Sequence, residues 1–476
     1  MPLKTKLEVL SKEDFIRVHN ASLKILKECG VVFKCQEAVD IFKQHGAKVD
    51  SGRVYFSQKM VEQALEQAPS TFKWQARNDA HSVTIGEGFA VQPNGGPVDI
   101  QDIENGRRPA TLADYANLQK LCQASDVISI VGSIPVEPQD IEPAHRPLRI
   151  TYEILKNTDK PLMSYCLYGR QIQPIFDMIE IAMGQKGFLS DHYTVGVSVN
   201  PLSPLKYATD ATETMIEYAK RNQPVFILSC ILAGVTGPVS LFGTTVQQNA
   251  EFLAGLVLLQ LINPGNPVVY CPASTVANMK NASYITGPPE AFLINTANLQ
   301  MALDFYKLPT RVMCGMTDSK RVDYQAGYET MQNMMMGMLS GAHIIHECLG
   351  VLDSIMCTSY EKFVIDEELL SRIMRISKGL DTSDEAMSLD VIRDVAKGGE
   401  YLTHDNTFEH VRDFWNPIVS TWDPYGVWEK EGAEDILVRA NKRFKQILAS
   451  CPDSLIDPDM DKELKDFVSR AVKTQL

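Results

Sequence analysis

The most constraining feature of the sequence is a repeated unit, a short apolar run followed by a helix-like stretch, which occurs eight times. Strands that alternate with helices predict a parallel sheet, because each return strand needs a crossover connection. Eight units are the number that closes a (β/α)8 TIM barrel, an α/β fold whose active sites lie at the carboxyl ends of the strands. The runs cover residues 89–93, 127–134, 161–167, 193–199, 224–230, 267–271, 310–315 and 342–348.

The remaining chain predicts an extension at each end of the barrel. Residues 1–88 are expected to form two amphipathic helices, the first opened by a capping box of Ser11 and Asp14, and one small sheet from the runs at 53–56, 72–76 and 81–85. The barrel is expected over residues 89–380. After Cys348 the chain is expected to be helical to its end, and residues 381–476 to pack on the barrel as a helical extension, because no low-complexity linker separates them.

Composition excludes several classes of partner. The net charge of −13, without a cluster of Lys and Arg, argues against nucleic acid. No apolar run reaches the roughly 18 residues that a membrane span needs. The ten cysteines occur singly, without a C-x-x-C pair, and the first residues lack the apolar segment of a signal peptide. We therefore expect a cytoplasmic protein with no membrane partner, and the Met-rich 334–336 segment and the aromatic tail are compatible with a homo-oligomer.

Polar residues follow several of the predicted strands. Asn94 precedes a double glycine, which either makes a plain turn or lets a ligand approach the backbone. Asn200 lies in a proline-stiffened loop that either is a structural turn or aims its amide inward. Gln248 and Glu251 lie in the first turns of an otherwise apolar helix, where buried polar side chains need partners. Glu251 either belongs to a site or simply interacts favourably with the positive end of the helix dipole.

The seventh and eighth strands carry the strongest candidates. Gly315 and Asp318 follow the seventh run, and the eighth contains His343 and His346. His346 lies near the carboxyl end of its strand, beside the Asp318 loop, a position that favours a site role over that of a satisfied core histidine. The spacing of the two histidines places them on opposite faces of a strand, so we predict no metal site.

The stretch at residues 237–275 (GPVSLFGTTVQQNAEFLAGLVLLQLINPGNPVVYCPAST) resembles the trimethylamine methyltransferase (MttB) family. The likeness begins near GGPVDIQDIENGRRPATLADYANL at residues 95–118 and continues through TDSK, QAGYE and SGAHIIHECLGVLDS. The ordered combination of QNAE, INPG, TDSK and QAGYE is specific, whereas each piece alone would be weak.

The resemblance implies a barrel that moves a methyl group from a methylated amine to a cob(I)alamin carried by a separate corrinoid-binding protein. Trimethylamine-specific members contain pyrrolysine, but this chain shows only the twenty standard residues and so looks like the non-pyrrolysine branch. Members of that branch act on quaternary amines such as glycine betaine, proline betaine, carnitine or γ-butyrobetaine. A quaternary nitrogen is already an activated leaving group, so the protein mainly positions the N–CH3 bond in line with cobalt.

The resemblance also suggests roles for the candidates. His346, Glu251 and Asp318 are the predicted catalytic residues. His346 and Asn94 are expected at the carboxylate end of the substrate, and Glu251 with Tyr328 or Phe363 at the ammonium end, since cations favour carboxylates and aromatic faces. Asn200, Gln248, Gly315 and Asp318 would complete the walls. Two alternatives stay open: another (β/α)8 transferase or decarboxylase, and a non-catalytic barrel that binds quaternary amines.

Overall fold

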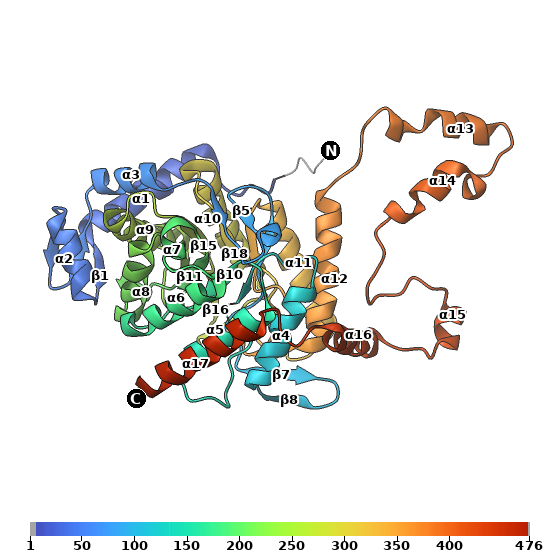
Figure 1. Ribbon diagram of the computed structural model, residues 1–476. Helices are drawn as coiled ribbons and strands as arrows, with labels where there is room; N and C mark the ends of the chain where they lie inside the picture. Colours follow the sequence, from blue (N-terminus) through green and yellow to red (C-terminus); the bar gives the residue numbers. More distant parts are fainter. Residues whose placement is uncertain (1–5, 133, 475–476) are drawn as a thin grey trace.

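The computed structural model describes residues 6–132 and 134–474 and has a mixed α/β architecture (Figure 1). Eight parallel strands lie at its centre. Every predicted apolar run contains or overlaps one of them, so the strand prediction is confirmed, although Ser133 in the second run lies outside the described residues. The strands are β6 (Ala90–Val91), β9 (Val131–Gly132), β10 (Leu162–Ser164), β11 (Val195–Val199), β13 (Val225–Ser229), β15 (Val268–Pro272), β18 (Arg311–Met313) and β19 (Ile344–His346).

The eight strands form two parallel sheets, one with the order β15-β13-β11-β10-β9 and one with the order β18-β19-β6. A bridge between Tyr270 and Thr310 links β15 to β18. At the other pair of edges, the amides of Ser129 and Ile130 donate to the carbonyl oxygen of Val91. Backbone hydrogen bonds therefore join the two sheets at both pairs of edges.

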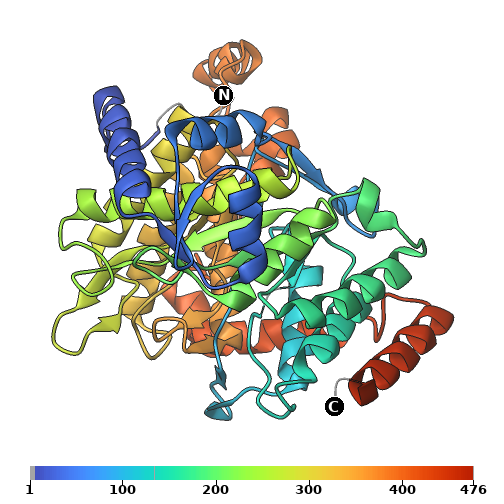
Figure 2. The ribbon, with the colours of Figure 1, turned by 90° about the vertical axis from the view of Figure 1, so that its left-hand side faces the viewer.

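A helix follows each central strand and covers its outer side (Figures 1 and 2). Helix α9 is apolar and buried around most of its circumference, because α1, α2, α3, α8 and α10 all pack against it. The short helix α7 (Phe188–Asp191) and a π-helical turn (Met301–Tyr306) extend α6 and α10. The eight helices are α4 (Leu112–Ala124), α5 (Arg146–Asn157), α6 (Gly169–Met183), α8 (Thr209–Lys220), α9 (Leu241–Ile262), α10 (Pro289–Gln300), α11 (Tyr324–Leu339) and α12 (Tyr360–Ser377).

The N-terminal part contains α1 (Lys12–Glu28), α2 (Gln36–Gln44) and α3 (Gln58–Gln67), and the predicted capping box of Ser11 and Asp14 starts α1. The prediction of one small sheet is wrong. One sheet has the order β12-β1-β3-β2 and comprises β1 (Val31–Phe33), β2 (Lys48–Asp50), β3 (Arg53–Tyr55) and β12 (Lys206–Tyr207). In contrast, β4 (Phe72–Trp74) and β5 (Val83–Ile85) pair only with each other among the described strands. The β4–β5 hairpin does not join the sheet of β1, β2 and β3, because its apolar side chains pack on the central strands instead.

The β4–β5 hairpin covers the amino end of the central strands. Trp74 is fully buried against Phe226, and its indole Nε1 donates to the Thr194 carbonyl 3.0 Å away. Gly196 makes the room for this ring, since a Cβ there would lie 2.7 Å from the indole. We call the apolar set that the hairpin shares with the strands the central core. It comprises Phe72, Trp74, Ile85, Ala90, Ile130, Met163, Phe226, Leu228, Val269, Cys271, Ala273, Met313, Met316, Ile344 and Val351.

Connections at the carboxyl ends of the strands form their own small sheets. Strands β7 (Asp99–Asp102) and β8 (Gly106–Pro109) pair with β20 (Val351–Leu352) and β21 (Cys357–Ser359). The prediction that the chain is helical directly after Cys348 is therefore wrong. This segment first completes a sheet with the β7–β8 hairpin, and helix α12 follows. A second sheet joins β14 (Leu232–Ala233), β16 (Thr275–Asn278) and β17 (Ser283–Tyr284).

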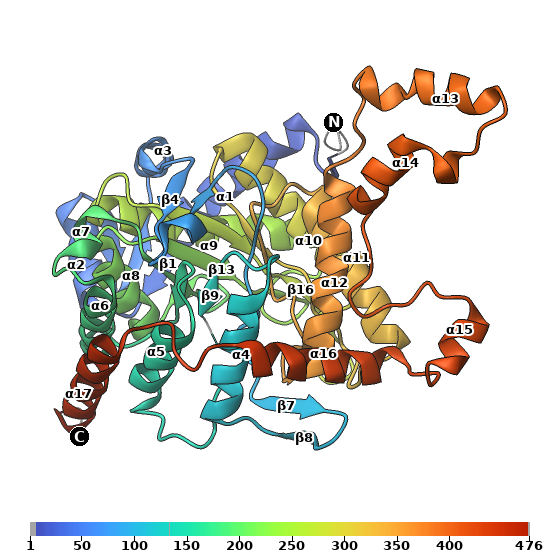
Figure 3. The same ribbon diagram turned by 45° about the vertical axis from the view of Figure 1, so that its right-hand side comes forward.

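The C-terminal part is divided between packed and projecting helices. Helices α16 (Ile436–Ser450) and α17 (Pro458–Thr474) pack on α4, α5, α6 and α12. In contrast, α13 (Leu389–Ala396), α14 (Asp405–His410) and α15 (Tyr425–Lys430) stand away from the rest of the molecule (Figures 1 and 3). Within the described part of the chain, we find no helix with the length and apolarity required to cross a membrane.

Candidate active site

Four polar side chains continue the inner face of the central strands beyond the central core. Alternate residues of a strand face the same side, so Gln92 follows Ala90, Arg311 accompanies Met313, and His346 follows Ile344. Ser198 of β11 joins them through a hydrogen bond from Arg311. A polar layer therefore borders the apolar core on the side of the carboxyl ends, and Arg311 joins it by extending its side chain from the start of β18 to Gln92 and Ser198.

Arg311 is the cation of this layer and is only 1% exposed. Its Nη1 donates to Gln92 Oε1 at 3.3 Å, its Nη2 donates to Ser198 Oγ, and its Cζ lies 4.9 Å from the centre of the Phe226 ring. Its Nε has no hydrogen-bond partner, and within residues 6–132 and 134–474 no carboxylate forms an ion pair with it. A buried charge without a counter-ion is costly, so Arg311 is a candidate to bind an anion.

Glu347 is the anion of the same region and is 2% exposed. Its Oε1 accepts hydrogen bonds from the Gly95 amide at 2.9 Å and from His346 Nε2 at 3.1 Å, while its Oε2 has no partner among the described residues. The backbone of Glu347 is left-handed, with φ +58°, a conformation that costs energy for a residue other than glycine and often marks functional positions. The free oxygen makes Glu347 a candidate to hold a cation.

Gly315 gives the strand end that carries Glu347 its close packing. A Cβ at Gly315 would lie 2.1 Å from the Cys348 Cα and 2.6 Å from the Glu347 carbonyl oxygen. Any larger residue would push the left-handed segment away from β18. Gly315 therefore supports the site through its lack of a side chain.

His346 is a neutral ring at neutral pH. Burial lowers its pKa, the nearby Arg311 charge adds to this effect, and the Glu347 carboxylate opposes it. Its Nδ1 has no hydrogen-bond partner among the described residues. The arrangement suits a neutral imidazole that donates one hydrogen bond to Glu347 and so orients the carboxylate.

Tyr284 lies close to the Glu347 side of the site. Burial raises the pKa of its hydroxyl well above the usual range, and the Cys230 thiol and the Glu347 and Asp318 carboxylates raise it further. The β16–β17 hairpin therefore carries an aromatic ring in the same part of the molecule as the Glu347 carboxylate. An aromatic ring beside a carboxylate is a favourable setting for an organic cation.

Glu251 and Gln248 are buried on α9. The Glu251 carboxylate accepts hydrogen bonds from Ser203 Oγ (2.8 Å), the Leu205 amide (3.0 Å) and Gln247 Nε2 (3.0 Å), and burial raises its pKa. It thereby holds the connection between β11 and α8. Gln248 accepts from Ser274 through Oε1, and its Nε2 has no partner within the described chain.

Asp318 and Asn94 connect loops at the strand ends. Asp318 accepts hydrogen bonds from the amides of Thr286 (2.8 Å) and Gly287 (2.9 Å) and from Ser354 Oγ. Asn94 donates to the Pro135 carbonyl at 2.8 Å and to Thr358 Oγ1 at 2.9 Å, and its Oδ1 lacks a partner among the described residues. Both side chains fix the shape of the region around Glu347.

The other predicted residues lie elsewhere. Asn200 is exposed, and Tyr328 is 51% exposed and contacts the ring of Tyr324 at 5.6 Å. Phe363 is buried in the apolar packing of α12. The structure thus brings His346, Gly315, Asn94 and Asp318 together around Glu347, and it places these three residues outside that group.

Sequence reasoning did not single out Gln92, Arg311 and Glu347 as site residues. The sequence does contain a signal that Arg311 is a site residue. An arginine inside an apolar run such as TRVMCG is unusual, because a buried arginine needs a group that pairs with its charge. Glu347 had none, because the left-handed turn that directs its side chain depends on tertiary contacts. Among the described residues, no group of three or more His, Cys, Asp or Glu side chains is arranged to hold a metal ion.

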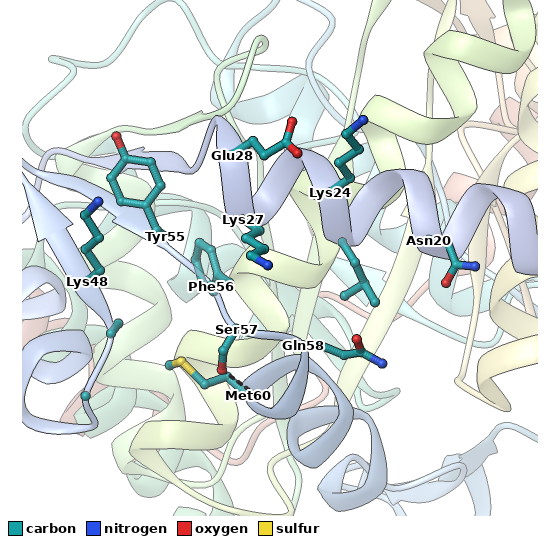
Figure 4. Close-up of a pocket in the computed structure, with 13 residues that line it drawn as sticks. Asn20, Lys24, Lys27, Glu28, Lys48, Tyr55, Phe56, Ser57, Gln58 and Met60 are labelled. Atoms are coloured by element: carbon teal, nitrogen blue, oxygen red, sulfur yellow. Dashed lines mark hydrogen bonds between the residues drawn. The ribbon is translucent and has the colours of Figure 1, made fainter.

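A separate hollow of about 710 Å³ lies on the N-terminal extension, between α1 and the segment that joins β3 to α3 (Figure 4). Lys24, Lys27, Lys48 and Asn20 line it, and their side chains point in different directions rather than toward a common point. It lies away from the strand ends, and the polar layer remains the better candidate site.

Comparison with known proteins now identifies the family. The family model described as trimethylamine methyltransferase (MTTB) matches residues 3–475. The chain belongs to the trimethylamine methyltransferase family. This confirms the resemblance seen in the sequence and makes the chain a methyltransferase.

Similar proteins include glycine betaine methyltransferase of Desulfitobacterium hafniense, 36% identical over 98% of this chain and 98% of that protein. Proline betaine:corrinoid methyltransferase of Eubacterium limosum is 32% identical over 97% of this chain and 96% of that protein. The monomethylamine methyltransferase (MtmB) structure from Methanosarcina barkeri shares the fold, with a TM-score of 0.54 and 12% identity over 98% of this chain and 90% of that chain.

Proposed function

We propose that this methyltransferase moves a methyl group from a betaine-type quaternary amine to a corrinoid presented by a partner protein, in the cytoplasm. The relatives named for glycine betaine and proline betaine support the substrate class. The two linked parallel sheets support a (β/α)8 barrel over residues 89–380, with extensions at 1–88 and 381–476. The active site would lie at the carboxyl ends of its strands.

The observation that carries the proposal is a pair of buried, opposite and incompletely partnered charges beside one histidine. Glu347 Oε1 lies 3.1 Å from His346 Nε2, and Arg311 belongs to the strand that pairs with the His346 strand. Each of the two charges has an atom without a partner among the described residues. A betaine is a zwitterion with a carboxylate and a quaternary ammonium. Arg311, with Gln92, would bind the carboxylate, and Glu347, with Tyr284, would hold the ammonium.

This orientation also points the methyl groups in a useful direction. Arg311 lies at the start of β18, deep between the strands, whereas Glu347 follows the end of β19. A substrate whose carboxylate meets Arg311 would therefore present its ammonium methyl groups toward the carboxyl ends of the strands. Binding at both ends fixes the N–CH3 bond, which is the orientation work that methyl transfer needs.

The corrinoid would supply a cobalt nucleophile from the partner protein. The chain's own residues bind and orient the amine and keep water away from it. No proton donor is needed, since a quaternary nitrogen leaves as a neutral amine. His346 would position Glu347 through its hydrogen bond, and Glu251, Asp318 and Asn94 would hold the surrounding loops. Gln248 Nε2 and Asn94 Oδ1, both unpartnered, would contact the substrate.

Exposed apolar side chains at the carboxyl ends support a protein partner there. The connections that follow the central strands expose large apolar side chains, and Val239 and Met279 both lie beside Gly234. Neighbouring exposed apolar side chains are typical of protein interaction sites. We call this set the rim. It comprises Tyr168, Leu202, Val235, Val239, Met279, Tyr324, Tyr328 and Met356.

The charge pair can be tested with two substrates that share a trimethylammonium group. Glycine betaine has a carboxylate and choline has a hydroxyl, so the wild type should consume cob(I)alamin with glycine betaine and much more slowly with choline. Arg311→Met should lower kcat/KM for glycine betaine by about a hundredfold, because removing one member of a buried charge pair costs about 2–5 kcal/mol. The same variant should leave the slow rate with choline nearly unchanged.

Two results would contradict the proposal. If the wild type consumes no cob(I)alamin with any quaternary amine, the function is wrong. If Arg311→Met lowers the rates with both substrates equally, Arg311 does not recognise a carboxylate, although the methyl transfer itself would stand.

A further inference from the structure

The connection that follows β20 contains a run of unusual backbone conformation. Asp353, Ser354 and Ile355 are consecutive and left-handed, with φ angles of +53°, +52° and +76°. Within residues 6–132 and 134–474, no other three consecutive residues besides glycine share this conformation. Isoleucine seldom adopts it, because its branched Cβ crowds the backbone. Strain of this kind persists only where the surrounding structure imposes it, and it often marks a functional position.

Hydrogen bonds from the connection between β18 and α11 impose this conformation. The amide of Asp353 donates to the Ser319 carbonyl at 2.8 Å, and the amide of Ser354 donates to the Thr317 carbonyl at 3.1 Å. Ser354 Oγ also donates to the Asp318 carboxylate. The neighbouring connection therefore holds the whole left-handed run in place, including the isoleucine that ends it.

The Ile355 side chain packs on the central core at the carboxyl ends of the strands. Four partly buried apolar side chains contact this core. Val83 and Tyr193 do so at the amino end, where the β4–β5 hairpin lies and β11 begins. In contrast, Cys230 and Ile355 follow β13 and β20, at the carboxyl ends. Ile355 thus covers the core on the side of the polar layer, and part of its surface is left uncovered.

Ile355 also contacts the loop that binds the Glu347 carboxylate. Its Cγ2 lies 3.5 Å from the position that a Cβ of Gly96 would take, which is an ordinary van der Waals distance. The preceding Gly95 amide donates to Glu347 Oε1 at 2.9 Å. The isoleucine and the carboxylate therefore contact adjacent residues of one loop, so an apolar side chain and an anion border the same part of the site.

We propose that Ile355 determines which ammonium group the site accepts. The inference rests on the betaine binding of the proposed function, since it concerns the amine that Glu347 would hold. A quaternary nitrogen is covered by carbon substituents, so it needs a carboxylate for its charge and an apolar surface for those substituents. Glu347 supplies the first and Ile355 the second. Because a β-branched side chain is stiff, this wall leaves room for methyl groups and limits larger substituents.

Ile355→Gly tests the proposal, because it removes the wall and relieves the backbone strain at the same time. Calorimetry on the full chain, without corrinoid, gives the Kd for glycine betaine and for proline betaine, whose nitrogen belongs to a bulkier ring. We expect the ratio of the two constants to shift at least tenfold toward proline betaine. A single methylene group in an apolar pocket already changes selectivity by about 10–200-fold.

Two further variants separate the wall from the backbone. Ile355→Val keeps the branched side chain and should keep most of the wild-type selectivity. Ser51→Gly is the matched control for strain, because Ser51 is also left-handed, with φ +50°, but lies in the turn between β2 and β3. It should leave both dissociation constants unchanged.

Thermal unfolding guards against a merely structural role. Large-to-small changes in a core lower stability, whereas Ile355→Gly should unfold close to the wild-type temperature, because the relieved strain offsets the lost contact. A large drop in that temperature, or an unchanged ratio of the constants, would overturn the role of Ile355. A wild type that binds betaines but consumes no cob(I)alamin with them would refute the methyl transfer alone, and one that binds neither betaine would refute both.

Discussion

At the scale of single residues, the site depends on His346 staying uncharged. Burial and the Arg311 charge lower its pKa below the ordinary value for histidine. In the unfolded chain the ring takes up a proton as the pH falls through about 6.5, while in the folded chain it resists protonation until a lower pH. The folded state therefore loses stability relative to the unfolded state as the pH falls below that ordinary value.

This shift predicts a pH profile. The wild-type rate with glycine betaine should be flat from pH 8 down to 6.5 and should fall at more acidic pH, where His346 becomes charged and the Arg311 side of the site becomes more positive. His346→Gln, which can still donate to Glu347 but does not titrate, should keep an appreciable rate and lose the acidic limb. A rate that already falls between pH 8 and 6.5, in the wild type but not in His346→Gln, would show that the pKa of His346 is not lowered and would contradict the argument.

At the scale of elements, α12 contains a buried ion pair beneath the left-handed turn at Gly350. Lys362 and Asp366 are 2.6 Å apart, both almost fully buried, and Asp366 also accepts from the Gly350 amide at 2.7 Å. Burial raises the pKa of Asp366 to about 6. Because this pKa is above that of the unfolded chain, the Asp366 contribution to stability decreases as the pH rises through about 6.

Removing one charge of this pair should be more damaging than removing both. Asp366→Asn should lower the free energy of unfolding by about 3–5 kcal/mol, because Lys362 would be left charged and buried. The double variant Lys362→Met with Asp366→Leu should recover much of that loss. Denaturant unfolding of the three proteins measures the difference, and a double variant less stable than Asp366→Asn would contradict the argument.

The elements were the most predictable level of the structure. The eight strands follow from apolar runs that tertiary structure had little reason to override, and the Ser11 capping box follows from local chemistry. The separate β4–β5 hairpin was not predictable, because its pairing depends on Trp74 filling the space beside Gly196. Glu347 was missed for the same kind of reason, since its orientation depends on a turn packed against Gly315.

At the scale of the whole molecule, the rim and the interior should be separable by experiment. Val239→Glu and Met279→Glu place charges on the rim, away from Arg311 and Glu347. They should slow methyl transfer to the corrinoid protein at least tenfold and leave the rate with free cob(I)alamin unchanged, because only the protein partner needs the rim. Ile16→Glu, which is similarly exposed on α1, is the matched control and should change neither rate.

If the rim variants slow both reactions equally, the rim belongs to the amine site and not to the partner. If they slow neither, the partner approaches from another direction.

The hairpin that carries Trp74 has a kinetic consequence. With the amino end of the strands covered, an amine bound by Arg311 and Glu347 and the corrinoid would both approach from the carboxyl ends, and whichever arrives last would block the exit of the other. On the proposed function, the amine would bind before the corrinoid protein, and the demethylated product would leave only after that protein departs. Turnover would therefore follow a compulsory order, and the dissociation of the corrinoid protein from the methyltransferase would limit its rate.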